Sequence, residues 1–271
     1  MADRGLWQDL PLPAARAAAG GPTLTIWHKL RSPQLQNYRD ILVGLPASYH
    51  EGTRTYPVIY MQDGQNLFDP ATSYAGDWEL LDTLRQAGET GHEAIVVGIA
   101  NTGRFRQYEY SPWRDPVHGG GDGDRYLDFV VETVRPLVEA HFRVRQGAGH
   151  TAIAGSSLGG LISLYALYRH PAVFGAAAAL SPSAWFADGA LITAVEREGP
   201  PPGRVYLDVG TAESEVLVAG VRRLDAAFRR AGLPASRYHY MEDVGAEHHE
   251  AHWARRFRAA WGFLVADGGT T

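Results

Sequence analysis

The residues most suited to chemistry lie in the stretch GSSLG (155–159), which fits the pattern Gly-x-Ser-x-Gly with Ser157 at its centre. An apolar strand pattern precedes this stretch and a helix pattern follows it, which is the context that the motif requires. We expect a sharp turn that exposes Ser157 as a nucleophile, because the flanking residues of Ser156 fit the pattern less well. The N–H of Leu158, at the start of the helix, is then placed to stabilise a developing oxyanion. A glycine- and serine-rich turn without chemistry is the alternative.

A nucleophilic serine needs a general base, and the chain has eleven histidines. In enzymes with this turn the acid follows the serine and the histidine comes last, so the base should follow the final strand. The segment 244–253 supplies His248, His249 and His252 there. We prefer His248, since His252 falls within the last predicted helix. Two alternatives stay open: a zinc site that uses His248 and His252 at i, i+4 spacing, and a polar helix start without chemistry.

The imidazole needs a carboxylate that fixes its tautomer. The segment YLDVGTAESE (206–215) ends a predicted strand between the serine and the histidine. Asp208 lies within that strand, whereas Glu213 lies in the loop beyond Gly210. We therefore choose Glu213 as the acid and keep Asp208 as the second choice. A carboxylate that stabilises the next helix N-terminus is the alternative role for Glu213.

Strand and helix patterns alternate along the chain after residue 22, which predicts an α/β fold with a mostly parallel sheet covered by helices on both faces. We expect a loose lead-in over residues 1–22 and one domain over 23–271. The predicted strands are 23–30, 37–46, 56–64, 92–101, 150–155, 174–182, 204–210 and 236–243, and the predicted helices are 125–142, 158–170, 214–232 and 250–265. Ligands of such sheets bind beyond the carboxyl ends of the strands, where the serine, acid and histidine are expected.

Composition excludes several classes of protein. The net charge of −5 and the isoelectric point near 6.1 argue against a nucleic-acid partner. Because the chain has no cysteine, disulfides, thiolate catalysis and zinc–thiolate sites are excluded. There is no signal-peptide pattern at the start and no apolar run of the roughly 18 residues that a membrane span needs. These features predict a cytoplasmic protein without a membrane partner; they leave the oligomeric state open.

Several motifs together resemble the esterase family of α/β-hydrolases, which includes esterase D-type enzymes, feruloyl and acetyl xylan esterases and siderophore-trilactone hydrolases. The resemblance covers roughly residues 23–265. It is carried by YMQDGQNLFD (60–69), GSSLGGLISLYA (155–166), LSPSAWF (180–186), YLDVGTAES (206–214) and EHHEAHW (247–253). It implies an α/β-hydrolase fold, a carboxylic ester hydrolase that forms an acyl-enzyme, a small-molecule ester as substrate, and no metal or other cofactor.

The resemblance also implies roles for single residues. Ser157 matches the nucleophile and His248 the base, while Glu213 stands where many relatives have aspartate. The second oxyanion N–H should come from the DGQN loop, at Gln65 or Gly64.

Two aromatic and polar segments, 76–84 and 103–126, are expected to border the pocket because loops carry specificity. The candidate substrate contacts are Trp78, Arg104, Arg106, Tyr110, Trp113 and Trp185. Two other functions use the same residues: an acyltransferase with the same triad, and a binding protein on an inactive hydrolase scaffold.

Overall fold

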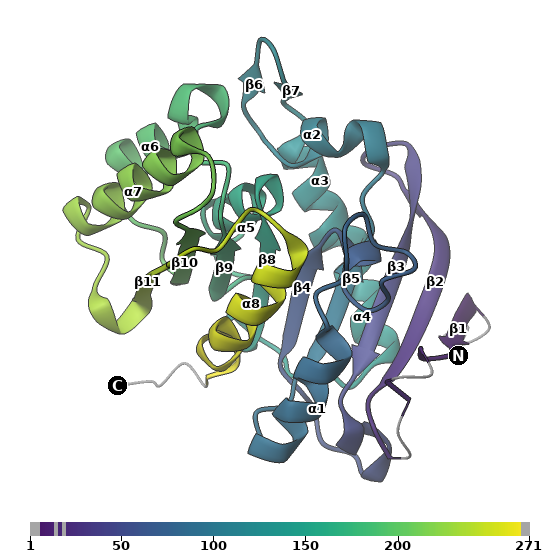
Figure 1. Cartoon of the computed structure of the whole chain (residues 1–271). Coiled ribbons are helices and arrows are strands. Elements are labelled where there is room, and N and C mark those ends of the chain that lie inside the picture. Colours follow the sequence, from purple (N-terminus) through teal and green to yellow (C-terminus); the bar gives the residue numbers. More distant parts are fainter. Residues whose placement is uncertain (1–5, 14–15, 18–19, 267–271) are drawn as a thin grey trace.

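The computed structural model describes residues 6–13, 16–17 and 20–266, and these form a twisted nine-stranded sheet between two layers of helices (Figure 1). The strands of this sheet are β1 (Trp7–Leu10), β2 (Thr23–Ser32), β3 (Asn37–Leu45), β4 (Val58–Gln62), β5 (Ile95–Ile99), β8 (Thr151–Ser156), β9 (Ala176–Leu180), β10 (Arg204–Gly210) and β11 (Tyr238–Asp243). A separate small hairpin pairs β6 (Arg114–Asp115) with β7 (Gly119–Gly120).

The order of strands is β1-β2-β3-β5-β4-β8-β9-β10-β11. The strands from β5 to β11 in this order pair in parallel, whereas β1, β2 and β3 are antiparallel to their neighbours. After β4, the next parallel strand, β5, lies on one side of β4. The later strands β8, β9, β10 and β11 follow one another on its other side, so the direction of strand order reverses between β4 and β8. Ligands of open α/β sheets bind at such a reversal, beyond the carboxyl ends of the strands.

The central strands β4, β5, β8 and β9 are buried at every residue. Such continuous apolar strands are expected when helices cover both faces of a sheet. One face packs against α3 (Gly123–Phe129), α4 (Arg135–His141), α5 (Leu158–Arg169), α6 (Phe186–Glu198) and α7 (Glu215–Arg230), and the other against α1 (Leu80–Thr90) and α8 (Glu250–Val265). The short helix α2 (Arg106–Glu109) follows β5.

Several elements differ from the sequence-based expectation. Residues 7–10, within the expected loose lead-in, form β1 and pair with β2. Helices α1 and α6 were not expected. The predicted helix over 125–142 contains five residues of π-helix, Val130–Val134, just before Pro136. This wider turn accommodates the proline, which has no N–H to donate. The last predicted helix has the expected bounds.

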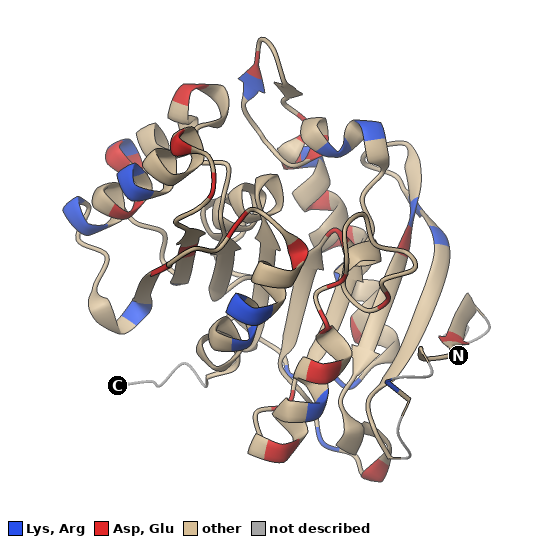
Figure 2. Ribbon diagram, viewed as in Figure 1, with Lys and Arg blue, Asp and Glu red and all other residues tan. Residues whose placement is uncertain are grey.

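Charged residues lie mainly on the helices and loops, where basic and acidic residues are interspersed, while the central strands carry few (Figure 2). No helix in the described part of the chain is long and apolar enough to cross a membrane.

Candidate active site

The turn between β8 and α5 holds Ser157 in a rare backbone conformation, with φ 57° and ψ −126°. Its N–H donates to Leu180 O on the neighbouring strand at 3.0 Å, which fixes the turn to the sheet. A side chain at Gly155 would lie 2.7 Å from the carbonyl carbon of Gly159, so glycine is needed where the strand and the helix approach. Leu158 has the first N–H of α5, which no carbonyl of that helix can accept.

The predicted base, His248, is hydrogen-bonded to the predicted acid, Glu213. His248 Nδ1 lies 2.7 Å from Glu213 Oε2, and the Glu213 side chain is fully buried while that of His248 is about one-third exposed. Burial by itself would raise the pKa of Glu213, but hydrogen bonds from His248, Ser181 and the Gly210 N–H outweigh it and lower that pKa. The acid is therefore held ionised against the imidazole.

The second oxygen of Glu213 belongs to a buried network. Glu213 Oε1 accepts hydrogen bonds from Ser181 Oγ at 2.5 Å and from the Gly210 N–H at 2.8 Å, and Arg256 Nη2 lies 3.3 Å away. Arg256 also donates through Nη1 to Asp208 Oδ1 at 2.8 Å. Asp208 is fully buried, and this burial raises its pKa to about 7. The second-choice acid thus points toward α8 and contacts Arg256.

Ser157 and His248 line the same cavity, which encloses about 540 Å³ at the carboxyl edge of the sheet. Ser157 Oγ lies 3.2 Å from Ser183 Oγ, and no hydrogen bond joins Ser157 to His248 among the described residues. Hydrogen bonds between catalytic groups often tighten only when substrate is bound. The remaining lining residues are Asp63, Gln65, Asn66, Tyr74, Ala75, Asn101, Gly103, Arg106, Ser156, His249, Glu250 and Trp253.

The loop after β4, which begins at Asp63, is held beside this cavity by hydrogen bonds and by close packing against β5. Asp63 has a left-handed φ of 55°, and its carboxylate accepts two hydrogen bonds from Arg106, at 2.7 Å each, and one from Asn101. A side chain at Gly64 would lie 2.5 Å from the carbonyl carbon of Gly98, so this glycine packs directly against β5. Gln65 Oε1 accepts from the Asn101 N–H at 3.1 Å. These contacts hold the loop in place beside the cavity, which Asp63, Gln65 and Asn66 line.

Of the six residues expected to contact substrate, only Arg106 lines the cavity. Trp78 is 3% exposed and packs on Trp253 and Phe257, so it is a core residue. Tyr110 is fully buried, and its hydroxyl accepts a hydrogen bond from the Asp63 N–H.

The other three lie away from the cavity. Arg104 is exposed and stacks on Phe105, Trp113 packs on Tyr165, and Trp185 packs on His118.

Sequence reasoning missed several residues of the site. Asn66, Asn101 and Glu250 line the cavity, and Ser183 contacts the hydroxyl of Ser157. Asn66 belongs to the DGQN loop and Ser183 to the LSPSAWF motif, so both lay within quoted motifs. Asn101 is the last residue of the predicted strand 92–101. A polar residue at the carboxyl end of a strand lies where ligands bind in such sheets, so this position could have identified Asn101 from the sequence.

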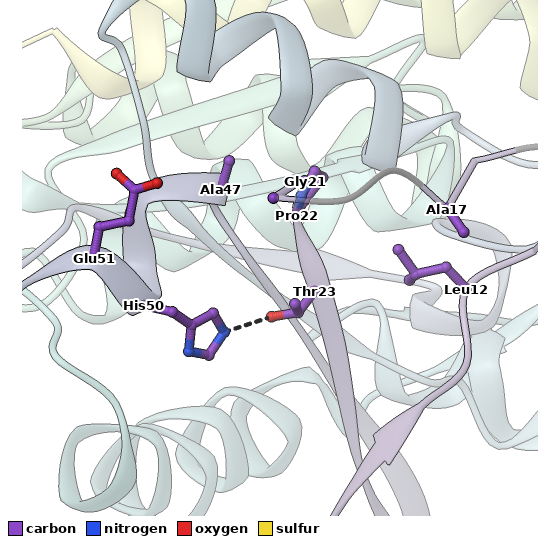
Figure 3. A pocket seen from close by; sticks show the side chains of 9 residues that line it. Leu12, Ala17, Gly21, Pro22, Thr23, Ala47, His50 and Glu51 are labelled. Carbon is purple, nitrogen blue, oxygen red and sulfur yellow. Dashed lines mark hydrogen bonds between the residues drawn. The ribbon is translucent and has the colours of Figure 1, made fainter.

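The structure has further cavities besides the one that Ser157 and His248 line. One of about 500 Å³, near residues 20–23 and 47–51, contains none of the predicted site residues; there His50 Nε2 lies 3.1 Å from Thr23 Oγ1 (Figure 3). A more apolar one of about 350 Å³, which Gly64 also lines, adjoins the site, because Gln65 lines both cavities. Within the described residues no three His, Cys, Asp or Glu side chains are grouped as metal ligands.

Comparison with known proteins places the chain in a family. The model of a family described as "Putative esterase" matches residues 32–264. The Uncharacterized protein YbbA of Bacillus subtilis is 26% identical over 240 residues, which cover 84% of this chain and 92% of that protein. A siderophore enterobactin esterase of Emericella nidulans is 33% identical over 162 residues, 51% of this chain and 50% of that protein, so the match spans half of that relative.

The fold agrees with this assignment. A solved ferulic acid esterase superposes with a TM-score of 0.71 at 20% identity, and the match covers 92% of this chain and 99% of that one. The predicted α/β-hydrolase fold is confirmed. The chain belongs to the esterase family of α/β-hydrolases and is an ester-hydrolysing enzyme.

Proposed function

We propose that the chain hydrolyses small-molecule carboxylic esters through an acyl-enzyme on Ser157, with His248 as general base and Glu213 as the acid that orients it. One observation carries this proposal: His248 bonds a buried, ionised Glu213 at 2.7 Å and lines the same cavity as a serine on a strained strand-to-helix turn. These are the groups and relative positions that acyl transfer needs.

In the acylation step, Ser157 Oγ attacks the ester carbonyl carbon while His248 Nε2 takes the hydroxyl proton. Glu213 keeps Nδ1 protonated, which leaves Nε2 free to accept. The carbonyl oxygen becomes an oxyanion that accepts hydrogen bonds from the Leu158 N–H and from the Gln65 N–H or the neighbouring Gly64 N–H. When the carbon–oxygen bond of the alcohol breaks, His248 returns the proton to the departing alcohol.

In the deacylation step, water enters the cavity and gives a proton to His248 Nε2 as it attacks the acyl carbon. The second oxyanion is held by the same N–H groups. Collapse releases the carboxylic acid and returns the proton to Ser157 Oγ, so the enzyme is regenerated without a cofactor. The cavity is wide enough for a small ester, since binding sites for small ligands commonly enclose about 300–1,000 Å³.

The assay that tests this proposal follows the release of p-nitrophenol from p-nitrophenyl acetate. We expect Ser157→Ala to reduce kcat by about 10⁴-fold or more, as loss of a triad nucleophile does in other enzymes. Ser156→Ala is the matched variant, and we expect it to retain most of the activity. Equal loss in the two variants, or activity retained by Ser157→Ala, would show that Ser157 is not the nucleophile.

Hydrolysis and acyl transfer are separated by the product. With a competing alcohol in the assay, a hydrolase gives mainly acetate, whereas an acyltransferase gives mainly the new ester. We expect acetate, because the 540 Å³ cavity contains polar side chains from several loops that water can reach.

A further inference from the structure

Glu250, the first residue of α8, places a carboxylate in the wall of the candidate active site. It lines the cavity with Ser157 and His248, yet the residue is only 7% exposed. Sequence reasoning treats this position as the polar start of a helix, and the proposed hydrolytic steps do not use it. A buried carboxylate facing a binding cavity therefore needs its own explanation.

The carboxylate has few partners for a group so buried. Asn66 Nδ2 approaches Oε1 at 3.5 Å, at the outer limit of a hydrogen bond, and the other contact is the N–H of Glu250 itself. No cation of the described residues forms an ion pair with it. The other two buried acids of the site differ, because Arg106 pairs with Asp63 while His248 and Arg256 pair with Glu213.

Within the described residues the Glu250 carboxylate has no direct ion pair, although the imidazoles of His249 and His248 attract its charge from a greater distance. Asp63 and Arg106 compensate each other through two hydrogen bonds, so neither is free to attract a substrate ion. The N-terminus of α8 offers Glu250 partial compensation only. Burial raises the pKa of Glu250, and the nearby Asp63 carboxylate adds to this rise, while the N–H of Glu250 and the imidazoles of His249 and His248 oppose it without outweighing it. A cationic group of a bound substrate would give the Glu250 carboxylate the direct ion pair that it lacks among the described residues.

We infer that Glu250 binds a protonated amino group of the substrate, so that the preferred esters carry a primary ammonium in their acyl or alcohol part. This inference rests on the proposed function and adds the substrate class. An ammonium group gives a charge-assisted hydrogen bond to the carboxylate, and such bonds are shorter and stronger than neutral ones. An ester of the same shape without the charge would leave Glu250 uncompensated in the complex.

The test compares esters of matched shape by pH-stat titration. On the acyl side the set is ethyl 5-aminopentanoate, ethyl 5-hydroxypentanoate and ethyl hexanoate; on the alcohol side it is 3-aminopropyl acetate and butyl acetate. We expect kcat/KM for the ammonium ester to exceed that for its apolar counterpart by about tenfold or more in one set. Glu250→Gln should bring that ratio to within about threefold of one.

Glu247→Gln is the matched control, since it makes the same change at an exposed carboxylate three residues earlier. It should preserve the ratio. A ratio near one in the wild type, or a ratio that Glu250→Gln leaves unchanged, overturns the inference. An equal advantage for the hydroxyl ester also overturns it, because Glu250 would then recognise any hydrogen-bond donor.

A binding experiment separates this inference from the proposed function. In the Ser157→Ala background, calorimetric titration with ethyl 5-aminopentanoate measures binding without turnover. We expect Glu250→Gln to weaken that binding by about tenfold relative to the binding of ethyl hexanoate. Equal affinity of the two proteins for the ammonium ester contradicts the role of Glu250, whether or not Ser157 is the nucleophile.

Discussion

The two oxygens of Glu213 have separate partners: Oε2 lies 2.7 Å from His248 Nδ1, while Oε1 accepts from Ser181 Oγ and the Gly210 N–H. One carboxylate thus joins the imidazole to the buried core behind it. Because four donors, Arg256 Nη2 included, fix the carboxylate, the orientation of the imidazole follows from the packing of β9, β10 and α8.

Removal of the negative charge at residue 213 should impair catalysis far more than the same change at the neighbouring acid. We predict that Glu213→Gln lowers kcat by roughly 10³–10⁴-fold, because the imidazole loses the partner that sets its tautomer. Asp208→Asn should lower kcat by less than about tenfold, since Asp208 contacts Arg256 and not His248. Steady-state kinetics on an aryl ester measure both. The reverse order of effects would make Asp208 the acid.

Arg256 is predicted to be a stability residue as well as a support for Glu213. Its guanidinium is 1% exposed and lies against Asp208 and Glu213. Arg256→Met should reduce the free energy of unfolding by about 3–5 kcal/mol, because two buried carboxylates lose their cation. The double variant Asp208→Leu/Arg256→Met should lose less unfolding free energy than Arg256→Met alone. Denaturant unfolding measures both, and an additive loss in the double variant would contradict the coupling.

Acid should weaken the protein partly through Glu213. Its pKa in the folded state lies below that of an unfolded chain, about 4.3, so the folded protein prefers the ionised form. This stabilisation is fully present above the unfolded value and is lost as the pH falls through the lower, folded value. The difference in unfolding free energy between wild type and Glu213→Gln should therefore be constant above about pH 5.5 and shrink below about pH 4.5. A difference that grows on acidification would contradict the lowered pKa.

The loop after β4, which we propose supplies the second oxyanion donor, should not tolerate a side chain at residue 64. A Cβ there would lie 2.5 Å from Gly98 C and 2.7 Å from Ile99 N, so the loop must move away from β5. We predict that Gly64→Ala lowers kcat by about 10²-fold, the effect of losing one oxyanion donor. Gly52→Ala is the control, because Gly52 has an extended φ and no atom within 4 Å of the added carbon. Similar kinetics for the two variants would exclude this loop from the oxyanion hole.

Local signals predicted the parts of the fold that depend on local structure. The bounds of α8 follow from helical spacing of apolar residues over 250–265, and the turn at Ser157 follows from glycines between a strand and a helix. The pairing of His248 with Glu213 also followed from chain order, because both lie in loops at one edge of a parallel sheet.

Long-range packing decided what the sequence could not reveal. Trp78 was expected at the pocket, but α1 and α8 pack on one face of the sheet and enclose it against Trp253. The four residues of β1 pair with the edge of β2, and Trp7 packs on Trp27 and on the distant Phe142. A glutamate at the start of a helix, such as Glu250, is expected to face solvent. In the structure it is covered by the loop that carries Asn66, which is 184 residues away in the sequence.

The most direct test of the account is the site of covalent labelling by a fluorophosphonate, located by peptide mass spectrometry. We predict a single adduct on the hydroxyl of Ser157, strongly slowed labelling in the His248→Ala variant, and none in Ser157→Ala. An adduct on another residue, or labelling that persists in Ser157→Ala, would contradict this prediction.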